Sequence, residues 1–176
     1  MIKINKADFS RILTLASDLK KRFCTNDPFE IATSLGALVR TKDLGTVKGM
    51  YVFHKRNRFI VINSSLCDVE KRIVCAHELG HDTLHRTLSE KSYLYDTHLY
   101  NFSLKPEFEA NIFASELLIN DEDVLKNAPV FETTDSLSGE LGVSADLLKL
   151  KCAILKSKGY NLPFNTDFDY NIFKGR

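Results

Sequence analysis

The sequence lacks an ordered cysteine pattern and an excess of charge of one sign. Its four cysteines, among 176 residues, include no C-x-x-C pair, which argues against a structural zinc knuckle or a disulfide framework and favours free thiols in a reducing cytosol. The formal net charge is +1, and there is no basic run or acidic tail. Charge therefore predicts no general attraction to nucleic acid.

A membrane-spanning or targeting segment is also missing. Residues 1–19 mix charged residues with an apolar stripe and show neither an uninterrupted apolar region nor a cleavage site. We therefore expect a cytoplasmic protein that does not bind membranes. Hydrophobic residues make up 44% of the chain, which suits one domain with its own core.

The rest of the chain centres on residues 73–85, which read IVCAHELGHDTLH. Here His77, Glu78 and His81 form an H-E-x-x-H pattern. Two histidines four apart lie on one face of a helix and can reach one metal ion, while the adjacent glutamate can move a proton. By chance the pattern would arise in about one of a hundred random chains of this composition. The alternative to a metal site is that the two histidines only pack on a core helix. The helical apolar stripe around it, and Gly80, which permits close approach of another segment, favour a metal site.

The pattern along the chain predicts a mostly helical α+β fold. Helical spacing of apolar residues, with caps or prolines at the starts, predicts helices over residues 6–23, 28–35, 68–86 and 106–120, and three short helices between 121 and 159, the last capped by Ser144. Met50–Phe53 and Phe59–Ile62 flank a polar turn and predict an antiparallel hairpin, either strand of which could pair with an extended peptide. We expect Thr87–Lys105 to be an irregular loop, and the tail from Asn161 onward to be extended and to fold back.

The predicted helix that begins at Pro106 can supply a third metal ligand. A catalytic zinc ion takes three protein ligands and keeps one position open for water, and the two motif histidines provide only two. Glu107 and Glu109 both lie in the first turn of this helix, and spacing alone does not separate them. For His85, a further histidine on the motif helix, we favour a packed position beside the site over direct ligation.

The motif helix and the later segment EFEANIFASELLIN together make the chain resemble the ImmA/IrrE family of zinc metallopeptidases, which includes phage and mobile-element anti-repressors. The resemblance covers about Asp27–Asn120 and includes an opening like DPFEIATSLG and a hairpin like GMYVFHKRNRFIVIN. It departs from the family at Asn120, where proline is usual, and we expect this to loosen a helix end and leave the chemistry intact. The resemblance implies a zincin-like metallopeptidase domain over residues 1–120, with residues 121–176 as a C-terminal helical segment and tail packed on the same domain.

By position, the resemblance implies that His77 and His81 hold Zn²⁺ with a glutamate at the start of the later helix, in a gluzincin-like arrangement. Glu107 matches that glutamate best. Glu78 is then the general base of a metalloendopeptidase. The implied partner is a protein substrate, a helix-turn-helix transcriptional repressor cut at one site. The donor for the developing oxyanion stays open among five residues: His85, Tyr93, Tyr95, His98 and Tyr100.

Two other classes of function remain open. A non-catalytic zinc-binding regulator would bind a protein or DNA through its C-terminal helices, where LSGELGVSADLLK has helix-turn-helix character with Gly142 in the turn. The lysines of the second helix are few and partly offset by Asp146, so nucleic acid is not an expected partner. A structural protein without a metal is the third class.

Overall fold

The computed structural model describes residues 4–86, 94–96 and 104–164. The helices in these ranges are α1 (Lys6–Phe23), α2 (Pro28–Ser34), α3 (Asp68–Leu84), α5 (Lys105–Leu118), α6 (Asp121–Asn127), α7 (Thr134–Leu141) and α8 (Ala145–Ser157). The strands are β1 (Leu38–Lys42), β2 (Gly49–His54), β3 (Asn57–Asn63) and β4 (Leu94–Asp96). The predicted α+β fold with mostly helical content is confirmed.

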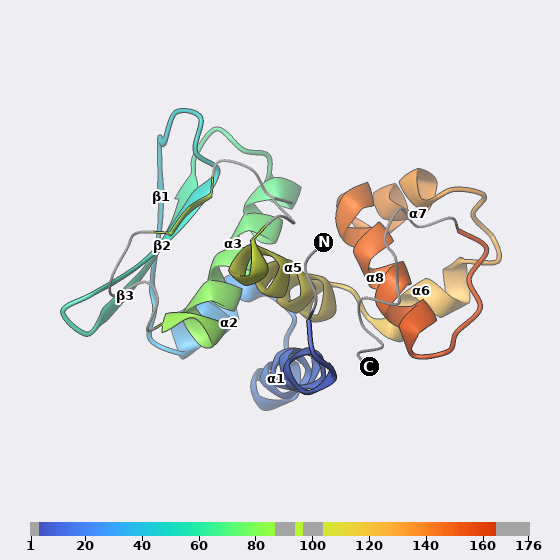
Figure 1. Cartoon of the computed structure of the whole chain (residues 1–176). Helices are drawn as coiled ribbons and strands as arrows, with labels where there is room; N and C mark the ends of the chain where they lie inside the picture. The colour runs from blue at the N-terminus through green and yellow to red at the C-terminus, as the bar shows by residue number, and fades with distance from the viewer. Residues whose placement is uncertain (1–3, 87–93, 97–103, 165–176) are drawn as a thin grey trace.

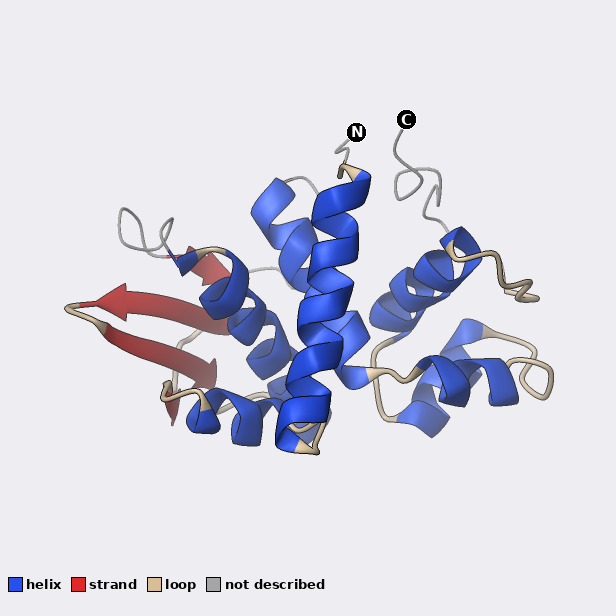
Figure 2. Ribbon diagram, turned by 90° about the horizontal axis from the view of Figure 1, so that it is seen from below, coloured by secondary structure: helices blue, strands red, loops and turns tan. Residues whose placement is uncertain are grey.

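The elements form three groups along the molecule (Figure 1). The sheet lies at one end with α2 and α3 beside it, α1 and α5 occupy the middle, and α6, α7 and α8 form the other end. Figure 2 shows the same order from below, with the strands and the C-terminal helices on opposite sides of α1. Among the helices of the described residues, none has the length and apolar character that crossing a bilayer requires.

Side-chain caps mark where α2 and α8 begin, as the sequence predicts. The Asp27 carboxylate accepts the Phe29 N–H at 2.8 Å, with Pro28 at the first helical position of α2. The Ser144 hydroxyl accepts the Leu147 N–H at 3.3 Å and starts α8. Gly142 ends α7 in the left-handed conformation, with φ 61°, which glycine adopts without steric cost.

The predicted hairpin is confirmed, but the sheet around it is mixed and larger than the sequence indicates. Strands β2 and β3 pair antiparallel, with Met50 opposite Val61. On the other side of β3, β1 pairs parallel, with Leu38 opposite Phe59. Nearly all of β1 is exposed, so it has no apolar alternation to mark it, and its extended form depends on the neighbouring edge of β3.

The irregular loop predicted over Thr87–Lys105 is wrong at Leu94–Asp96, which form β4. This strand pairs antiparallel with Gly49–Tyr51 of β2. Three residues are too few to show a period in the sequence, so only the pairing with β2 identifies the strand. The remaining residues of that stretch before Leu104 lie outside the described ranges.

The prediction that either hairpin strand offers an edge for a peptide is wrong for β3 and for the first half of β2. The strand order is β1-β3-β2-β4, so β3 is paired on both sides and β2 is covered by β4 over Gly49–Tyr51. The outer strands of the described sheet are β1 and β4. β3 and the first half of β2 are occupied because distant segments complete their hydrogen-bond ladders.

Most of helix α3 is enclosed by neighbouring elements. All ten residues of Ile73–Asp82 are buried, because α3 packs against β2 and β3 on one side and against α5 on another. Gly80 permits the contact with α5: a Cβ there would lie 3.1 Å from Ala110 Cα and 3.2 Å from Phe113 Cδ1. The expected role of Gly80 in close approach is confirmed.

The three short C-terminal helices form as predicted, and a buried lysine joins them to the rest. Lys151 of α8 is 0% exposed, and its ammonium lies 2.6 Å from both Glu116 of α5 and Asp121 of α6. Burial acts to raise the pKa of Asp121, but hydrogen bonds from Lys151 and Lys158 outweigh it and lower that pKa. The start of the predicted tail packs back on α8, because Phe164 is buried and its carbonyl accepts from Lys156. The rest of the tail lies outside the described residues. The division of the chain at residue 120 stays a prediction.

Replacing Lys151 with methionine tests this ion pair. Lys151→Met removes the buried ammonium that lies between Glu116 and Asp121, and the more exposed Lys158 is left to pair with both, so we expect the free energy of unfolding to fall by about 3 kcal/mol. Lys126→Met on α6 is the control, because Lys126 is exposed and its replacement should cost less than about 1 kcal/mol. Urea unfolding of both variants measures the difference, and equal losses would contradict the assignment.

Candidate metal centre

Three side chains converge where α3 meets the start of α5. His77 and His81 present their Nε2 atoms 3.0 Å apart. The Glu107 carboxylate lies 3.1 Å from His77 Nε2 through one oxygen and 3.4 Å from His81 Nε2 through the other. These three residues form a group that could hold a metal ion, with two imidazole nitrogens and a carboxylate as donors.

The opposite nitrogen of each imidazole contacts a polar partner. His77 Nδ1 donates to the amide oxygen of Asn111 at 3.1 Å. His81 Nδ1 lies 3.1 Å from His85 Nδ1, and His85 Nε2 lies 2.9 Å from a Glu109 oxygen. A partner on Nδ1 fixes the ring orientation and leaves Nε2 for a metal.

Burial and charge produce the protonation states that metal binding needs. His81 is 1% exposed, and burial lowers the pKa of its imidazole to about 4. Burial acts to raise the pKa of Glu107, but hydrogen bonds with His77 and His81 outweigh it and hold that pKa well below its usual range. At neutral pH the site therefore offers a neutral His81 ring and an ionised carboxylate.

Glu78 lies beside this group on α3, and its side chain is fully buried. A Cβ placed on Gly49 would lie 3.0 Å from Glu78 Oε1 and 2.4 Å from Val74 Cγ1. The glycine at the start of β2 thus brings the strand backbone against the glutamate. No larger residue fits there unless Val74 or Glu78 moves.

A second buried carboxylate, Asp82, anchors the motif helix to the sheet. It accepts hydrogen bonds from the Tyr51 hydroxyl at 2.7 Å and from Arg58 at 3.2 Å, and Arg58 also donates to the Leu35 carbonyl. Burial and Asp82 raise the pKa of Tyr51, so its phenol stays protonated and continues to donate. This anchor sits directly after His81.

The structure brings together His77, His81 and Glu107 and places Glu109 on His85 instead. His85 contacts His81 and not the converging nitrogens, as its expected packed position requires. Of the oxyanion candidates, Tyr95 lies in β4 opposite Met50, and Tyr93, His98 and Tyr100 lie outside the described residues.

Two contacts that support the site lie outside the predictions from sequence. The first is the Asp82 anchor, for which an acidic residue inside a buried helical run is a usable signal. The second is the contact between Asn111 and His77. Asn111 lies four residues after Glu107, one turn along the same helix face, and that spacing marks it as a partner of the same site.

The chain matches the peptidase family described as the IrrE N-terminal-like domain over residues 32–152. It belongs to this family. The resemblance to ImmA/IrrE proteins is thereby confirmed, and the chain is a metallopeptidase by family. The metal that the family implies fits the donor set of His77, His81 and Glu107.

Two relatives show how far the similarity extends. The chain is 35% identical over 148 residues to "Uncharacterized immunity region protein 2" of Bacillus phage phi105, covering 84% of this chain and 92% of that protein. It is 28% identical over 108 residues to "Metallopeptidase ImmA" of Bacillus subtilis (strain 168), covering 61% of this chain and 63% of that protein. The similarity to the phage protein therefore extends beyond the motif helices.

Substitution of Gly80 tests the close contact that places Glu107. In Gly80→Ala the new Cβ meets Ala110 backbone, so we expect a loss of about 1–3 kcal/mol in the free energy of unfolding. Gly139→Ala on α7 is the control, since its Cβ meets nothing within 4 Å and should stabilise the helix by up to about 1 kcal/mol. Urea unfolding of both variants measures the effect. A Gly80→Ala protein as stable as the unmodified chain would show that α5 can shift without cost.

Proposed function

We propose that this protein is a zinc-dependent endopeptidase of the gluzincin type that cleaves a helix-turn-helix transcriptional repressor at one site. The observation that carries the proposal is the convergence of His77, His81 and Glu107, with Glu78 next to the first histidine. A tetrahedral zinc ion with bonds of about 2.0–2.2 Å holds neighbouring ligand atoms roughly 3.3–3.6 Å apart. The two Nε2 atoms lie 3.0 Å apart, and each lies near a different Glu107 oxygen, at 3.1 Å and 3.4 Å, which is close to that spacing.

The proposed chemistry divides between the ion and the chain. When bound, zinc supplies Lewis acidity that lowers the pKa of a water and polarises a peptide carbonyl. His77, His81 and Glu107 hold the ion, and Asn111 orients the His77 ring. Glu78 takes a proton from the attacking water and passes it to the leaving amine. Its burial beside β2 separates the carboxylate from bulk solvent, which suits a group that must exchange protons with substrate.

The proposed substrate follows from the family resemblance and the relatives. One relative is named as an immunity region protein of a phage and the other as a metallopeptidase, which fits proteolysis of a repressor that maintains phage immunity. Site-specific cleavage of one regulator also suits a protease that works in the cytoplasm. The repressor encoded beside the gene is therefore the first substrate to test.

A non-catalytic regulator that reads DNA through its C-terminal helices fits the structure less well. In α8, the second helix of the helix-turn-helix-like segment, the eight residues Leu147, Leu148, Leu150, Lys151, Cys152, Ala153, Ile154 and Leu155 are buried. A recognition helix must expose the face that enters the DNA groove. The Lys151 ammonium is instead buried in ion pairs with Glu116 and Asp121, so it is not available to contact DNA. Packing against α5 is the better account of this segment.

Replacing each of the two glutamates identifies the third ligand. We expect Glu107→Gln to weaken zinc retention far more than Glu109→Gln, because Glu107 faces both motif histidines and Glu109 faces His85. Zinc content after dialysis against a weak chelator, determined by elemental analysis, measures the difference. If Glu109→Gln empties the site while Glu107→Gln does not, the ligand assignment is wrong.

Replacing Glu78 tests the enzyme itself. Glu78→Gln should keep about one equivalent of zinc and lower the rate of repressor cleavage by a factor of about 10² to 10⁴, since the amide cannot carry the proton. His81→Ala is the contrasting variant and should lose zinc and cleavage together. Mass spectrometry of the repressor products, with and without a chelator, measures cleavage. A Glu78→Gln protein that cleaves as fast as the unmodified chain would favour another mechanism, and an unmodified chain that keeps its zinc without cleaving the repressor would favour a binding module.

A further inference from the structure

The geometry points to Glu109 as a positioning residue that acts through His85 on His81, an inference that rests on the proposed metal site. Three side chains stand in a row: His81 Nδ1 is 3.1 Å from His85 Nδ1, and His85 Nε2 is 2.9 Å from Glu109 Oε2. The row leads from a buried ring to a carboxylate whose side chain is 13% exposed. It joins the end of α3 to the first turn of α5.

Metal binding sets the direction of every hydrogen bond in this row. A ring nitrogen that binds a metal does so through its lone pair and carries no hydrogen. His81 Nε2 faces His77 and Glu107, so the ring hydrogen of the ligating form lies on Nδ1 and is donated to His85 Nδ1. His85 must then carry its own hydrogen on Nε2, and it donates that hydrogen to Glu109. An ionised carboxylate only accepts, so Glu109 selects this arrangement over the reverse one.

The two metal-facing histidines are thus supported differently. His77 Nδ1 faces the amide oxygen of Asn111, and a rotation of that amide would present a donor in its place and satisfy the other tautomer of the ring. The position of the His81 ring hydrogen depends on His85 and, through it, on Glu109, whose ionised carboxylate has no hydrogen to donate. The tautomer of His81 is therefore the more strictly specified of the two.

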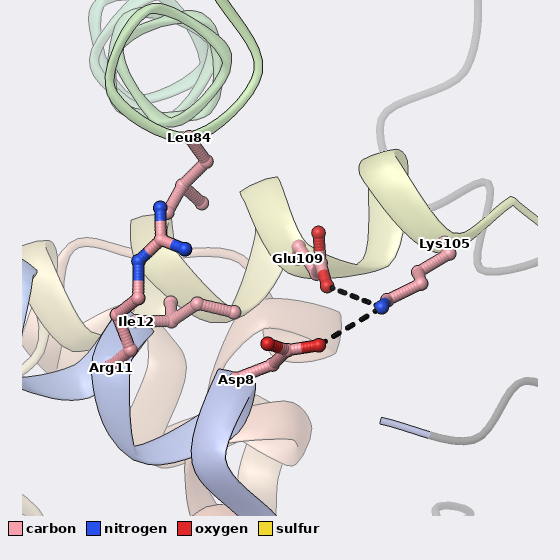
Figure 3. Close-up of a pocket in the computed structure, with 6 residues that line it drawn as sticks. All are labelled: Asp8, Arg11, Ile12, Leu84, Lys105 and Glu109. Carbon is pink, nitrogen blue, oxygen red and sulfur yellow. Dashed lines mark hydrogen bonds and ion pairs between the residues drawn. The ribbon is translucent and has the colours of Figure 1, made fainter. Parts of the chain in front are cut away.

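Figure 3 shows how the Glu109 carboxylate is held. The Lys105 ammonium lies between α1 and α5, 3.5 Å from Glu109 Oε1 and 3.0 Å from Asp8 Oδ2. Beside them is a pocket of about 210 Å³ lined by Asp8, Arg11, Ile12, Leu84, Lys105 and Glu109. One oxygen of Glu109 is paired on the pocket side, which leaves the other to face His85.

Zinc affinity measures this role without any need for a substrate. In the full chain, Glu109→Gln keeps the size of the side chain but introduces a donor, so zinc affinity should fall by about 10-fold to 100-fold. Glu122→Gln, at an exposed position of α6, removes the same charge and should leave the affinity unchanged. Competition with a chromophoric zinc chelator at constant pH gives the affinities.

The His85 variants separate positioning from simple packing. His85→Phe removes the acceptor for His81 Nδ1 and should weaken zinc at least as much as Glu109→Gln, whereas His85→Gln retains an acceptor oxygen and should restore part of the affinity. Thermal unfolding of the metal-free proteins is the second readout, and we expect Glu109→Gln to unfold at the temperature of the unmodified chain.

Two outcomes would overturn the inference: a Glu109→Gln protein that binds zinc as tightly as the unmodified chain, or a loss of affinity matched by a lower unfolding temperature without metal. Failure of the unmodified chain to bind zinc would instead overturn the proposed function.

Discussion

The close contact between α3 and α5 at Gly80 is the constraint on which the candidate site depends. The two histidines belong to α3 and Glu107 belongs to α5, so the distance between these helices sets the distance between the donors. A side chain at Gly80 would meet the backbone of Ala110 at 3.1 Å and push the helices apart. Metal–ligand distances tolerate only a few tenths of an ångström, so even a small separation would carry Glu107 out of reach.

Buried charges hold the two helices in that position from both sides. Asp82 fastens α3 to the sheet through Tyr51 and Arg58, and Lys151 fastens the far end of α5 to α8 through Glu116. A buried charge is costly unless it is paired and hydrogen-bonded, and each of these is paired with groups from another element. Such pairs restrict each helix to one register on its neighbour, which suits a site assembled from two helices.

The protonation of the site agrees with the proposed chemistry. Burial lowers the pKa of His81, so its imidazole stays neutral at neutral pH. The same enclosure keeps its Nε2 directed at Glu107. Glu78 is also closely enclosed, because the strand backbone at Gly49 lies against its carboxylate and leaves no room for a side chain on residue 49. Membership of the IrrE N-terminal-like peptidase family and the enclosed donor set therefore support the same function.

Local features of the sequence were sufficient to predict most of the elements. Helix starts at Asp27 and Ser144, the hairpin around Met50 and Val61, and the motif helix all rest on caps and periods that act within a few residues. The strands β1 and β4 could not be predicted in this way. Both are strands because they form hydrogen bonds to partners distant in the chain, and neither sequence has an apolar alternation of its own.

The candidate site, too, could be predicted only in part from the sequence. The spacing of His77 and His81 on one helix already implies a shared ligand position, because four residues make about one turn. Glu107 and Glu109 are two residues apart, about 200° around the helix, and either could have faced the histidines. Only the rotation of α5, set by the packing of residues such as Phe113 against α3, turns Glu107 toward His77 and His81 and leaves Glu109 to His85.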